Sequence, residues 1–478
     1  MKMKDSGVAW IGKIPAVWET RNLTHCCRFF KGLAITKADL TETGTAVISY
    51  GQIHSKLNVG THLKPELLRC VPEAIANADP GSRLKVGDIV FADTSEDVEG
   101  CGNCVLMDAD IPVYAGYHAI VARPEEPSRS RYFSYLFNAP CWRSQVRSKV
   151  AGIKVFSITQ RIFKGVSVLL PSESDANAIV AYLDEKTAAI DARVAVLEKK
   201  LAAYRRLKTS VINQAVTRGL DPKTKLKDSG VDWIGKIPAG WEVGRVKDAA
   251  IIGNGSDPKT DGDIPVYGSG EGAFKTCGEF KEGPVVLIGR KGALHIPHYV
   301  EGRYWNVDTA FDVRVSGENS LRWFYYQALR FEYRYYMSQT TLPSMTQSDY
   351  QNMVIGIPSP TEQRAIADYL DAECAKIDKM AELVTREIEL YKKLKRSLIN
   401  EIVTGKRAVA GEGLGDGERD DRDHRDERDE SHEALATHCR AVRGAKAPKR
   451  RVPDVPEVSG VPCSGRSGNC PVKGVRDE

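Results

Sequence analysis

The sequence predicts an α+β protein in which one arrangement occurs twice: a compact domain of mixed strands and helices, followed by a long helix. Three observations predict it. A sixteen-residue segment near the start of the chain recurs in its middle. A long apolar pattern with heptad spacing follows each domain. Between these repeats lie short strand-like runs separated by glycine and proline, which are typical of compact α+β domains.

Composition and charge narrow the class of protein. The 478 residues are 42% hydrophobic and 27% charged, which excludes a wholly disordered chain, a collagen-like fibre and a disulfide-rich miniprotein. No run approaches the ~18 apolar residues of a membrane span, and the first residues lack the apolar core of a signal peptide, so we expect a cytoplasmic protein. The net charge is +5 overall and +7 over residues 1–407, a mild excess that permits a polyanionic partner.

The first repeat is an opening segment in each half of the chain. Residues 4–19 are KDSGVAWIGKIPAVWE, and residues 227–242 are KDSGVDWIGKIPAGWE. Fourteen of the sixteen positions are identical, which chance does not explain. We infer that one unit was duplicated and that its copies then diverged.

The second repeat predicts two long helices. Residues 171–217 and 358–404 align without a gap and share 18 of 47 positions. Apolar residues recur every seven positions, with a second row four residues later, and so form a continuous seam for a partner helix; each helix would extend about 60 Å. The heptad positions are Leu183, Ile190, Leu197, Tyr204 and Val211, then Leu370, Ile377, Val384, Tyr391 and Leu398. Ser172 and Ser359 are the predicted N-caps.

Strand and helix patterns also recur in the divergent segments between the repeats. Strand-like runs occupy residues 45–50, 84–92, 284–288 and 309–315, and aromatic, helix-like stretches occupy 132–137 and 323–329. Two short matches remain between the domains: residues 118–123 correspond to 309–314, and residues 157–160 correspond to 344–347. The two domains are therefore predicted to be one domain type that was duplicated and then diverged.

Four motifs together resemble the specificity subunit of a Type I restriction–modification system. They are the repeated opening segment, GRKGALHIPHYVEGRYWNVDTAF at 289–311, LPSMTQSDY at 342–350 and PSPTEQRAIADYLD at 358–371. The resemblance covers about residues 1–407. It implies two α/β target recognition domains joined by two long antiparallel coiled-coil helices, with a pseudo-two-fold internal repeat. The first helix departs from the family pattern at its start: residues 172–177 are SESDAN, whereas the second copy has SPTEQR at 359–364.

The resemblance further implies a non-catalytic DNA-recognition subunit. Each domain would read one half of a bipartite, asymmetric site, while the paired helices set the half-site spacing and bind the methyltransferase subunits. The implied partners are double-stranded DNA, two modification subunits and the restriction subunits, with no membrane. This chain would hold no cofactor, because S-adenosylmethionine, ATP and Mg²⁺ belong to the partner subunits. Two related domains held apart by paired helices also match the geometry of two half-sites on one face of a duplex, where equivalent positions recur about every 34 Å.

Candidate DNA contacts follow from residue chemistry. Lys and Arg neutralise phosphates, whereas Arg, Gln, Ser and Thr also bind base edges. In 289–292, glycines flank two basic residues and permit close approach to phosphate; an ordinary basic turn is the alternative. The candidates are Lys149, Lys154, Ser157, Thr159 and Gln160 in the first domain, and Arg290, Lys291, Arg303, Tyr304, Gln339, Thr341, Ser344, Thr346 and Gln347 in the second. The arginines of 322–334 could stack on bases, but a packed aromatic face with arginines at its rim is favoured.

Enzymatic alternatives lack the necessary motifs. The sequence has no phosphate-binding P-loop, no dinucleotide-binding pattern and no adenine-methyltransferase motif. The acidic cluster within 93–99 could hold Mg²⁺, but a turn-rich acidic loop is favoured. Cys101 and Cys104 form a lone pair without the two further ligands of a zinc site, so no metal site is predicted. A scaffold that does not bind DNA would explain the helices but leave the paired domains without a role.

The predicted domain boundaries follow the repeats. They are 1–170 for the first recognition domain, 171–218 for the first helix, 219–227 for a linker, 228–357 for the second recognition domain, 358–407 for the second helix and 408–478 for a tail. Mixed charge without apolar periodicity predicts that the tail is disordered.

Overall fold

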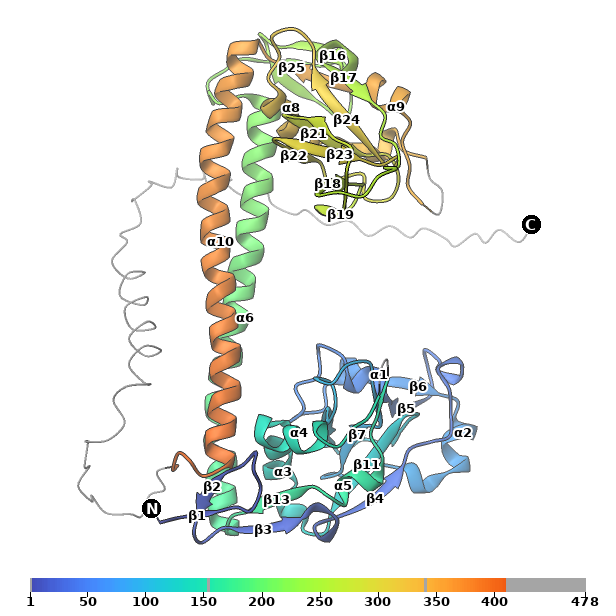
Figure 1. Cartoon of the computed structure of the whole chain (residues 1–478), viewed down its shortest axis with the longest axis vertical. Helices are drawn as coiled ribbons and strands as arrows, with labels where there is room; N and C mark the ends of the chain where they lie inside the picture. The colour runs from blue at the N-terminus through green and yellow to red at the C-terminus, as the bar shows by residue number, and fades with distance from the viewer. Residues whose placement is uncertain (1, 153–154, 339–341, 410–478) are drawn as a thin grey trace, which may run out of the picture. The chain divides into compact units, whose positions relative to one another are not determined.

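The computed structural model describes residues 2–152, 155–338 and 342–409, and its longest elements are two helices that lie side by side (Figure 1). They are α6 (Glu173–Arg218) and α10 (Pro360–Val403). Both predicted caps are confirmed: Asp175 N donates to Ser172 Oγ at 3.1 Å, and Glu362 N donates to Ser359 Oγ at 3.3 Å. At about 1.5 Å per residue, α6 extends about 69 Å.

The two helices run antiparallel because each end of one meets the opposite end of the other. Leu183, near the start of α6, shares a core cluster with Ile402, near the end of α10. Val216, near the end of α6, shares another cluster with Ile366, near the start of α10. Each globular domain therefore packs on the beginning of one helix and the end of the other.

The first domain precedes α6 and contains short strands and helices around two larger sheets, one of three strands and one of four, with further strands in two-stranded pairs. Its elements are β1 (Met3–Asp5), β2 (Lys13–Pro15), β3 (Glu19–Asn22), β4 (Cys27–Lys31), β5 (Thr45–Ile48), α1 (Tyr50–Ile53), β6 (Arg69–Val71), α2 (Glu73–Ala78), β7 (Ile89–Ala92), β8 (Thr94–Ser95), β9 (Cys104–Leu106), β10 (Val113–Ala115), β11 (Ala119–Pro124), α3 (Ser130–Asn138), α4 (Pro140–Arg147), β12 (Phe156–Ser157), α5 (Gln160–Phe163) and β13 (Ser167–Leu170).

The second domain lies between α6 and α10 in the sequence. Its elements are β14 (Leu226–Asp228), β15 (Lys236–Pro238), β16 (Glu242–Arg245), α7 (Val246–Ala249), β17 (Ala250–Gly253), β18 (Ile264–Tyr267), β19 (Ala273–Cys277), β20 (Lys281–Glu282), β21 (Val285–Gly289), β22 (His298–Val300), β23 (Arg303–Asn306), β24 (Ala310–Val315), α8 (Leu321–Ala328), α9 (Gln347–Asn352) and β25 (Val354–Ile357). Residues 410–478, nearly all of the predicted tail, lie outside the described residues.

The two domains share most of their sheet topology, although the sheet that holds the parallel pair has three strands in the first domain and four in the second. Each contains a four-stranded antiparallel sheet, in the order β4-β11-β7-β9 in the first domain and β17-β24-β21-β22 in the second. Each also contains one parallel strand pair, β5 with β10 and β18 with β23. Pairing of β3 with β13, and of β16 with β25, brings the start of each domain beside its end. In each domain, therefore, an early strand pairs with the last strand, directly before the long helix begins.

Hydrophobic packing confirms the main strand and helix predictions. The runs predicted as strands at 45–50, 84–92 and 309–315 contain β5, β7 and β24, and the run at 284–288 overlaps β21. The aromatic stretch at 132–137 lies within α3, and the stretch at 323–329 overlaps α8. Trp323, Phe324 and Tyr326 are buried in the second core, which confirms a packed aromatic face. None of the described helices combines the length and apolar character needed to span a membrane.

Candidate nucleic-acid interface

In the second domain, the loop after β21 is fixed by three backbone hydrogen bonds. Arg290 N donates to Thr309 O at 2.7 Å, and Met345 N donates to Arg290 O at 3.0 Å. Gly292, whose φ is 82°, donates its N–H to Pro343 O at 2.9 Å. Three segments that are distant in sequence thus meet at this loop, and the positive φ explains the glycine.

The same loop carries two basic side chains without an acidic partner. Arg290 is half-buried; its Nη1 donates to Asp308 O at 3.3 Å, and its guanidinium lies 5.9 Å from the centre of the Phe311 ring. Lys291 is exposed and forms a β-bridge to Ser344. Among the described residues, no Asp or Glu forms an ion pair with Arg290 or Lys291. Their charge is available to a phosphate or to the acceptor edge of guanine.

Two other candidates of the second domain use their polar groups within the fold. Thr346 Oγ1 accepts from Asp349 N at 3.1 Å and caps α9, while Gln347 Nε2 donates to Ile252 O at 2.6 Å. Thr346 is exposed and Gln347 is half-buried. These hydrogen bonds position the loop beside Ser344.

Arg303 and Tyr304 are neighbours in β23 but face opposite environments. Arg303 is exposed, with its guanidinium 4.5 Å from the centre of the Phe280 ring. Tyr304 is fully buried in a cluster with Val285 and Leu287. Alternating strand residues point to opposite faces, so the aromatic neighbour of an exposed arginine enters the core. Tyr304 is not available to DNA and does not belong to the interface.

The first-domain candidates lie mainly on one segment. Ser157 is exposed and pairs with Thr94 through β12 and β8; Thr159 is exposed and precedes α5, and Gln160 is half-buried within it. Lys149 is exposed after α4, and its side chain covers Gly165. Three further candidates, Lys154, Gln339 and Thr341, lie outside the described residues.

Three residues absent from the sequence-based candidates occupy this first-domain surface: Asp93, Thr94 and His118. His118 Nδ1 lies 2.9 Å from Asp93 Oδ1, and Thr94 Oγ1 donates to the same oxygen at 2.8 Å. The match of residues 118–123 with 309–314 was the signal that could have indicated them, because it aligns His118 with Thr309 beside the basic loop.

The predicted helix seam is buried or half-buried at all ten positions. In the middle of the pair, Leu197, Tyr204, Val384 and Tyr391 belong to one hydrophobic cluster between α6 and α10. Nearer the ends, Leu183 and Leu370 pack into the cores of the first and second domains. The seam therefore joins helix to helix at its centre and helix to domain at its ends.

Equivalent polar clamps join each domain to its long helix. In the first domain, the carboxylate of Asp184 accepts from Arg131 Nη2 at 2.6 Å and from the Tyr135 hydroxyl at 2.5 Å. In the second, Asp371 Oδ1 accepts from Arg322 Nε at 2.7 Å and from the Tyr326 hydroxyl at 2.6 Å. Asp371 follows Asp184 at the offset of the helical repeat, so duplication preserved the clamp.

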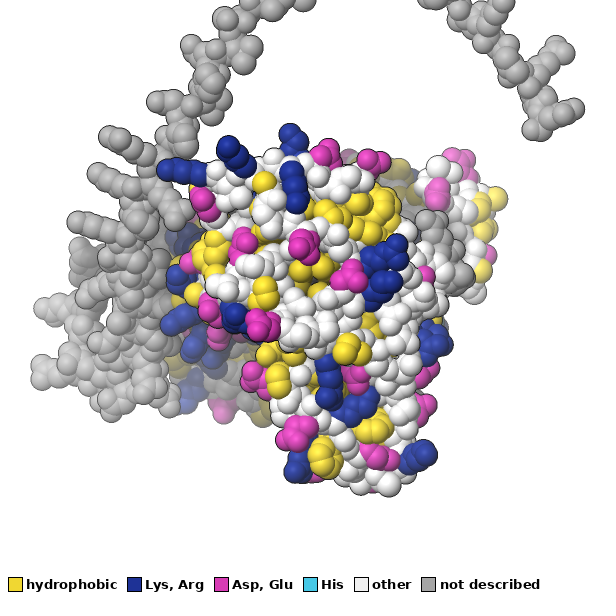
Figure 2. All heavy atoms as spheres, turned by 90° about the horizontal axis from the view of Figure 1, so that it is seen from above, with side chains coloured by type: hydrophobic (Ala, Val, Ile, Leu, Met, Phe, Trp, Pro, Cys, Tyr) yellow, Lys and Arg dark blue, Asp and Glu magenta, His cyan; other side chains and the backbone are white. Residues whose placement is uncertain are grey.

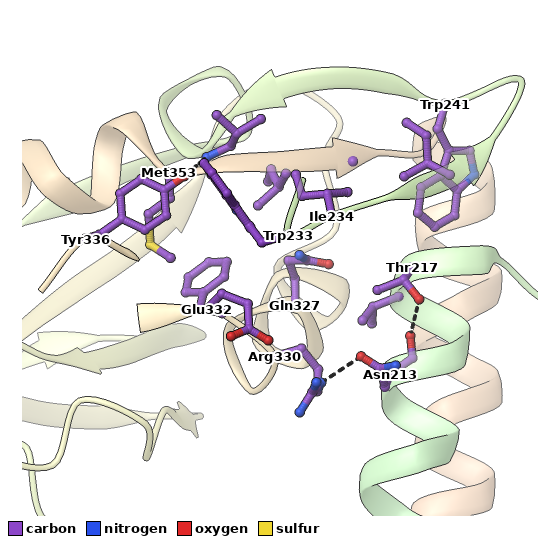
Figure 3. Close-up of a pocket in the computed structure, with 16 residues that line it drawn as sticks. Asn213, Thr217, Trp233, Ile234, Trp241, Gln327, Arg330, Glu332, Tyr336 and Met353 are labelled. Atoms are coloured by element: carbon purple, nitrogen blue, oxygen red, sulfur yellow. Dashed lines mark hydrogen bonds between the residues drawn. The ribbon is translucent and has the colours of Figure 1, made fainter. Parts of the chain in front are cut away.

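A further hydrogen bond joins the C-terminal part of α6 to the second domain (Figure 3). Arg330 Nε donates to Asn213 Oδ1 at 2.9 Å, at the edge of a cavity lined in part by Trp233 and Gln327. Arg322 and Arg330 thus bind helix side chains, as expected for arginines at the rim of a packed face. The stacking alternative for these two residues is not supported.

The described residues contain no group of three or more His, Cys, Asp or Glu side chains that could hold a metal ion. Asp93 instead binds Thr94 and His118, and Asp97 Oδ1 accepts from Gly100 N. Cys101 and Cys104 are buried free thiols, and burial raises the pKa of Cys104 to about 12. The acidic segment therefore forms a structured loop.

Surface charge is mixed where it can be seen from above in Figure 2. On that face Lys and Arg side chains are dispersed among Asp and Glu and between hydrophobic groups. This agrees with the small net charge of the chain.

Comparisons with known proteins identify the architecture. The family model of the Type I restriction modification DNA specificity domain matches residues 238–389. A Methanocaldococcus jannaschii protein, assigned as the MjaX type I restriction enzyme specificity subunit, is 22% identical over 425 residues, covering 83% of this chain and 95% of that relative.

Solved structures agree at the level of the fold. A chain from a study of complex assembly and conformational transition of the type I R-M system superposes with a TM-score of 0.63; it is 17% identical, and the match covers 82% of this chain and 99% of the other. The HsdS subunit from Thermoanaerobacter tengcongensis is also 17% identical, over 82% and 98% of the two chains, but its TM-score of 0.44 is too low to support an argument. The family model thus matches the second domain and the start of α10, and over 83% of its length the chain is similar to a type I restriction enzyme specificity subunit.

Proposed function

We propose that the domains predicted at 1–170 and 228–357 each read one half of a bipartite, asymmetric DNA site. The observation that carries this proposal is a repeated fold with unlike surfaces: the four-stranded antiparallel sheets β4-β11-β7-β9 and β17-β24-β21-β22 correspond strand for strand, whereas the loop after β21 is basic and the loop after β7 begins with Asp93. A shared backbone presents both surfaces in the same way. Different side chains on it would select different bases.

The paired helices, predicted at 171–218 and 358–407, would set the distance between the half-sites. Support comes from the central apolar cluster and from ion pairs that cross between the helices, such as Lys208 with Asp378 at 2.6 Å. Both fix the register of one helix against the other. Each domain is clamped to this pair, so the register determines where the domains stand along a duplex.

The modification subunits would bind the exposed sides of the helices. On α10, Met380, Leu383, Leu390 and Leu394 are 36–44% exposed and recur at steps of three, seven and four. This second apolar row is exposed beside the central seam and suits a helix of another chain. The duplicated helix sequences favour two modification subunits, and restriction subunits would join them. S-adenosylmethionine, ATP and Mg²⁺ would be bound by these partners, in the cytoplasm.

Methylation mapping tests this function. A host that carries the chain and its modification subunits should show adenine methylation at one bipartite motif, and deletion of the chain alone should abolish methylation at that motif. Methylation that persists without the chain, or that depends on the chain but lacks sequence selectivity, would contradict the proposal. A control host should express the modification subunits at the same level.

A further inference from the structure

The loops that follow β7 and β21 occupy the same place in the two domains. Asp93 N donates to His118 O at 3.0 Å, as Arg290 N donates to Thr309 O. In return, Ile158 N donates to Asp93 O at 2.7 Å, as Met345 N donates to Arg290 O. These bonds align Asp93 with Arg290 independently of sequence similarity.

The next positions extend the correspondence. Thr94 pairs with Ser157 through β8 and β12, just as Lys291 forms a bridge to Ser344. The aligned side chains differ in chemistry: the second domain presents Arg290 and Lys291, which only donate hydrogen bonds, whereas the first presents the acceptor carboxylate of Asp93 and the hydroxyl of Thr94, which donates to it. Corresponding sites of the two domains would therefore favour different ligand edges.

His118 is held on the first-domain surface in an unusual conformation. Its φ of 53° is the only positive value for a non-glycine residue among those described, although histidine tolerates this region better than most residues do. Its side chain is 55% exposed, and that of Asp93 is 30% exposed. The rings of Tyr50 and Tyr117 lie 5.4 and 5.9 Å from the imidazole. The backbone strain places an imidazole–carboxylate pair at an accessible site.

This pair can offer hydrogen-bond acceptors. When Asp93 accepts the Nδ1 proton of a neutral His118, Nε2 remains an acceptor, and Asp93 Oδ2 has no hydrogen-bond partner among the described residues. A carboxylate is repelled by phosphates, so it gains little from the DNA backbone. The exocyclic amino groups of cytosine and adenine, in contrast, donate hydrogen bonds in the major groove.

We propose that Asp93 and His118 are specificity-determining residues that bind an exocyclic amino group in the half-site of the first domain. Arg290 and Lys291 hold the corresponding position in the second domain and bind acceptors there. This inference rests on the proposed function, because it assigns the side chains by which one half-site is read. The asymmetry of the recognised site then follows in part from one pair of aligned loops.

The test maps methylated motifs in hosts that carry the modification subunits with wild-type or variant chain. Asp93→Asn keeps the shape of the side chain but replaces one carboxylate oxygen with a donor. His118→Gly removes the imidazole at a backbone conformation that glycine adopts readily. Each variant should lower discrimination at one or more bases of a single half-site roughly 5- to 160-fold, the range expected for loss of one base contact of about 1–3 kcal/mol. The other half-site and the spacer should remain unchanged, and Lys291→Gln should alter the opposite half-site.

The chain offers a matched control in a second histidine–aspartate pair of the first domain. His62 Nδ1 lies 2.6 Å from Asp108 Oδ2, and the two side chains have the same exposures, 55% and 30%. Asp108→Asn should leave every base of the motif unchanged. If Asp93→Asn lowers the thermal stability of the chain, the base discrimination of His118→Gly is used in its place to test the proposal.

Two failures can be distinguished. If the wild-type chain directs no bipartite motif, the proposed function is wrong. If the wild-type motif is bipartite but both Asp93→Asn and His118→Gly retain full discrimination, or weaken both half-sites equally, then Asp93 and His118 do not read bases.

Discussion

Lys208 of α6 binds Asp378 of α10 with its Nζ 2.6 Å from the Oδ2 atom, and the duplication repeats this pair as Lys395 with Asp191, also at 2.6 Å. The two lysines, like the two aspartates, are separated by the offset of the helical repeat. The pairs are thus related by the internal symmetry of the antiparallel helices. The same lysine–aspartate pair, present twice, therefore favours one register of α6 against α10 at two places along the helices.

Reversing one charge should weaken this register. Lys208→Glu should lower the free energy of unfolding by about 0.5–1 kcal/mol, because exposed pairs contribute little individually, and adding Asp378→Lys should restore most of the loss. Chemical denaturation of the four chains measures the coupling. Lys186→Glu is the control, since Lys186 pairs with its neighbour Glu185 on the same helix. No recovery in the double variant would mean that the pair does not couple the helices.

Truncating the central seam should cost far more. Leu197 is 2% exposed between the helices, and Leu197→Ala should lower the unfolding free energy by about 2–4 kcal/mol, through lost burial and the cavity left behind. The neighbouring Val196 is 56% exposed, so Val196→Ala should change it by less than about 0.5 kcal/mol. Equal effects in the same denaturation assay would contradict the helix-to-helix packing.

Removing a domain clamp should loosen one domain. Asp371→Ala leaves Arg322 and the Tyr326 hydroxyl without their shared acceptor, at an expected cost of about 1–3 kcal/mol. Amide hydrogen exchange should increase mainly in α8 and the facing turns of α10. Asp368→Ala, at an exposed position three residues earlier, is the control. Exchange that rises equally in the first domain would argue against a local clamp.

Buried thiols should resist modification until the chain unfolds. Burial raises the pKa of Cys104 and Cys141 to about 12, from an ordinary value of 9.0. Peptide mapping after alkylation at pH 8 should therefore show labelled Cys70, which is half-buried, but unlabelled Cys104 and Cys141. Because the unfolded thiols lose their protons first, the unfolding free energy should fall as pH rises from about 9 towards 12. Rapid labelling of Cys104 in the folded chain would contradict its burial.

The elements that the sequence predicted best are those with a repeating signal. The helices α6 and α10 each extend over more than forty residues and carry a heptad pattern, and Ser172 and Ser359 are local caps that need no tertiary contact. The sheet strands at β7 and β21 are continuous apolar runs. In each case, neighbouring residues contain the information that determines the element.

The interface was harder to predict because its contacts are not local. The pairing of Asp93 with His118 joins loops 25 residues apart, and the alternation of Arg303 and Tyr304 depends on which strands flank β23. Thr346 and Gln347 have side chains suited to base contact, yet both also hold the backbone around α9. Residue type indicates what a side chain can bind, whereas the tertiary fold decides whether it is free to do so.

The proposal that the paired helices set the distance between the half-sites can be tested by lengthening both helices together. Four residues inserted within 190–211, with four at the corresponding place within 377–398, should extend each helix by about 6 Å. Methylation mapping with the partner subunits present should then report a longer spacer between half-sites whose bases are unchanged. Altered half-site bases with an unchanged spacer would contradict the claim that the domains read the sequence and the helices set the distance.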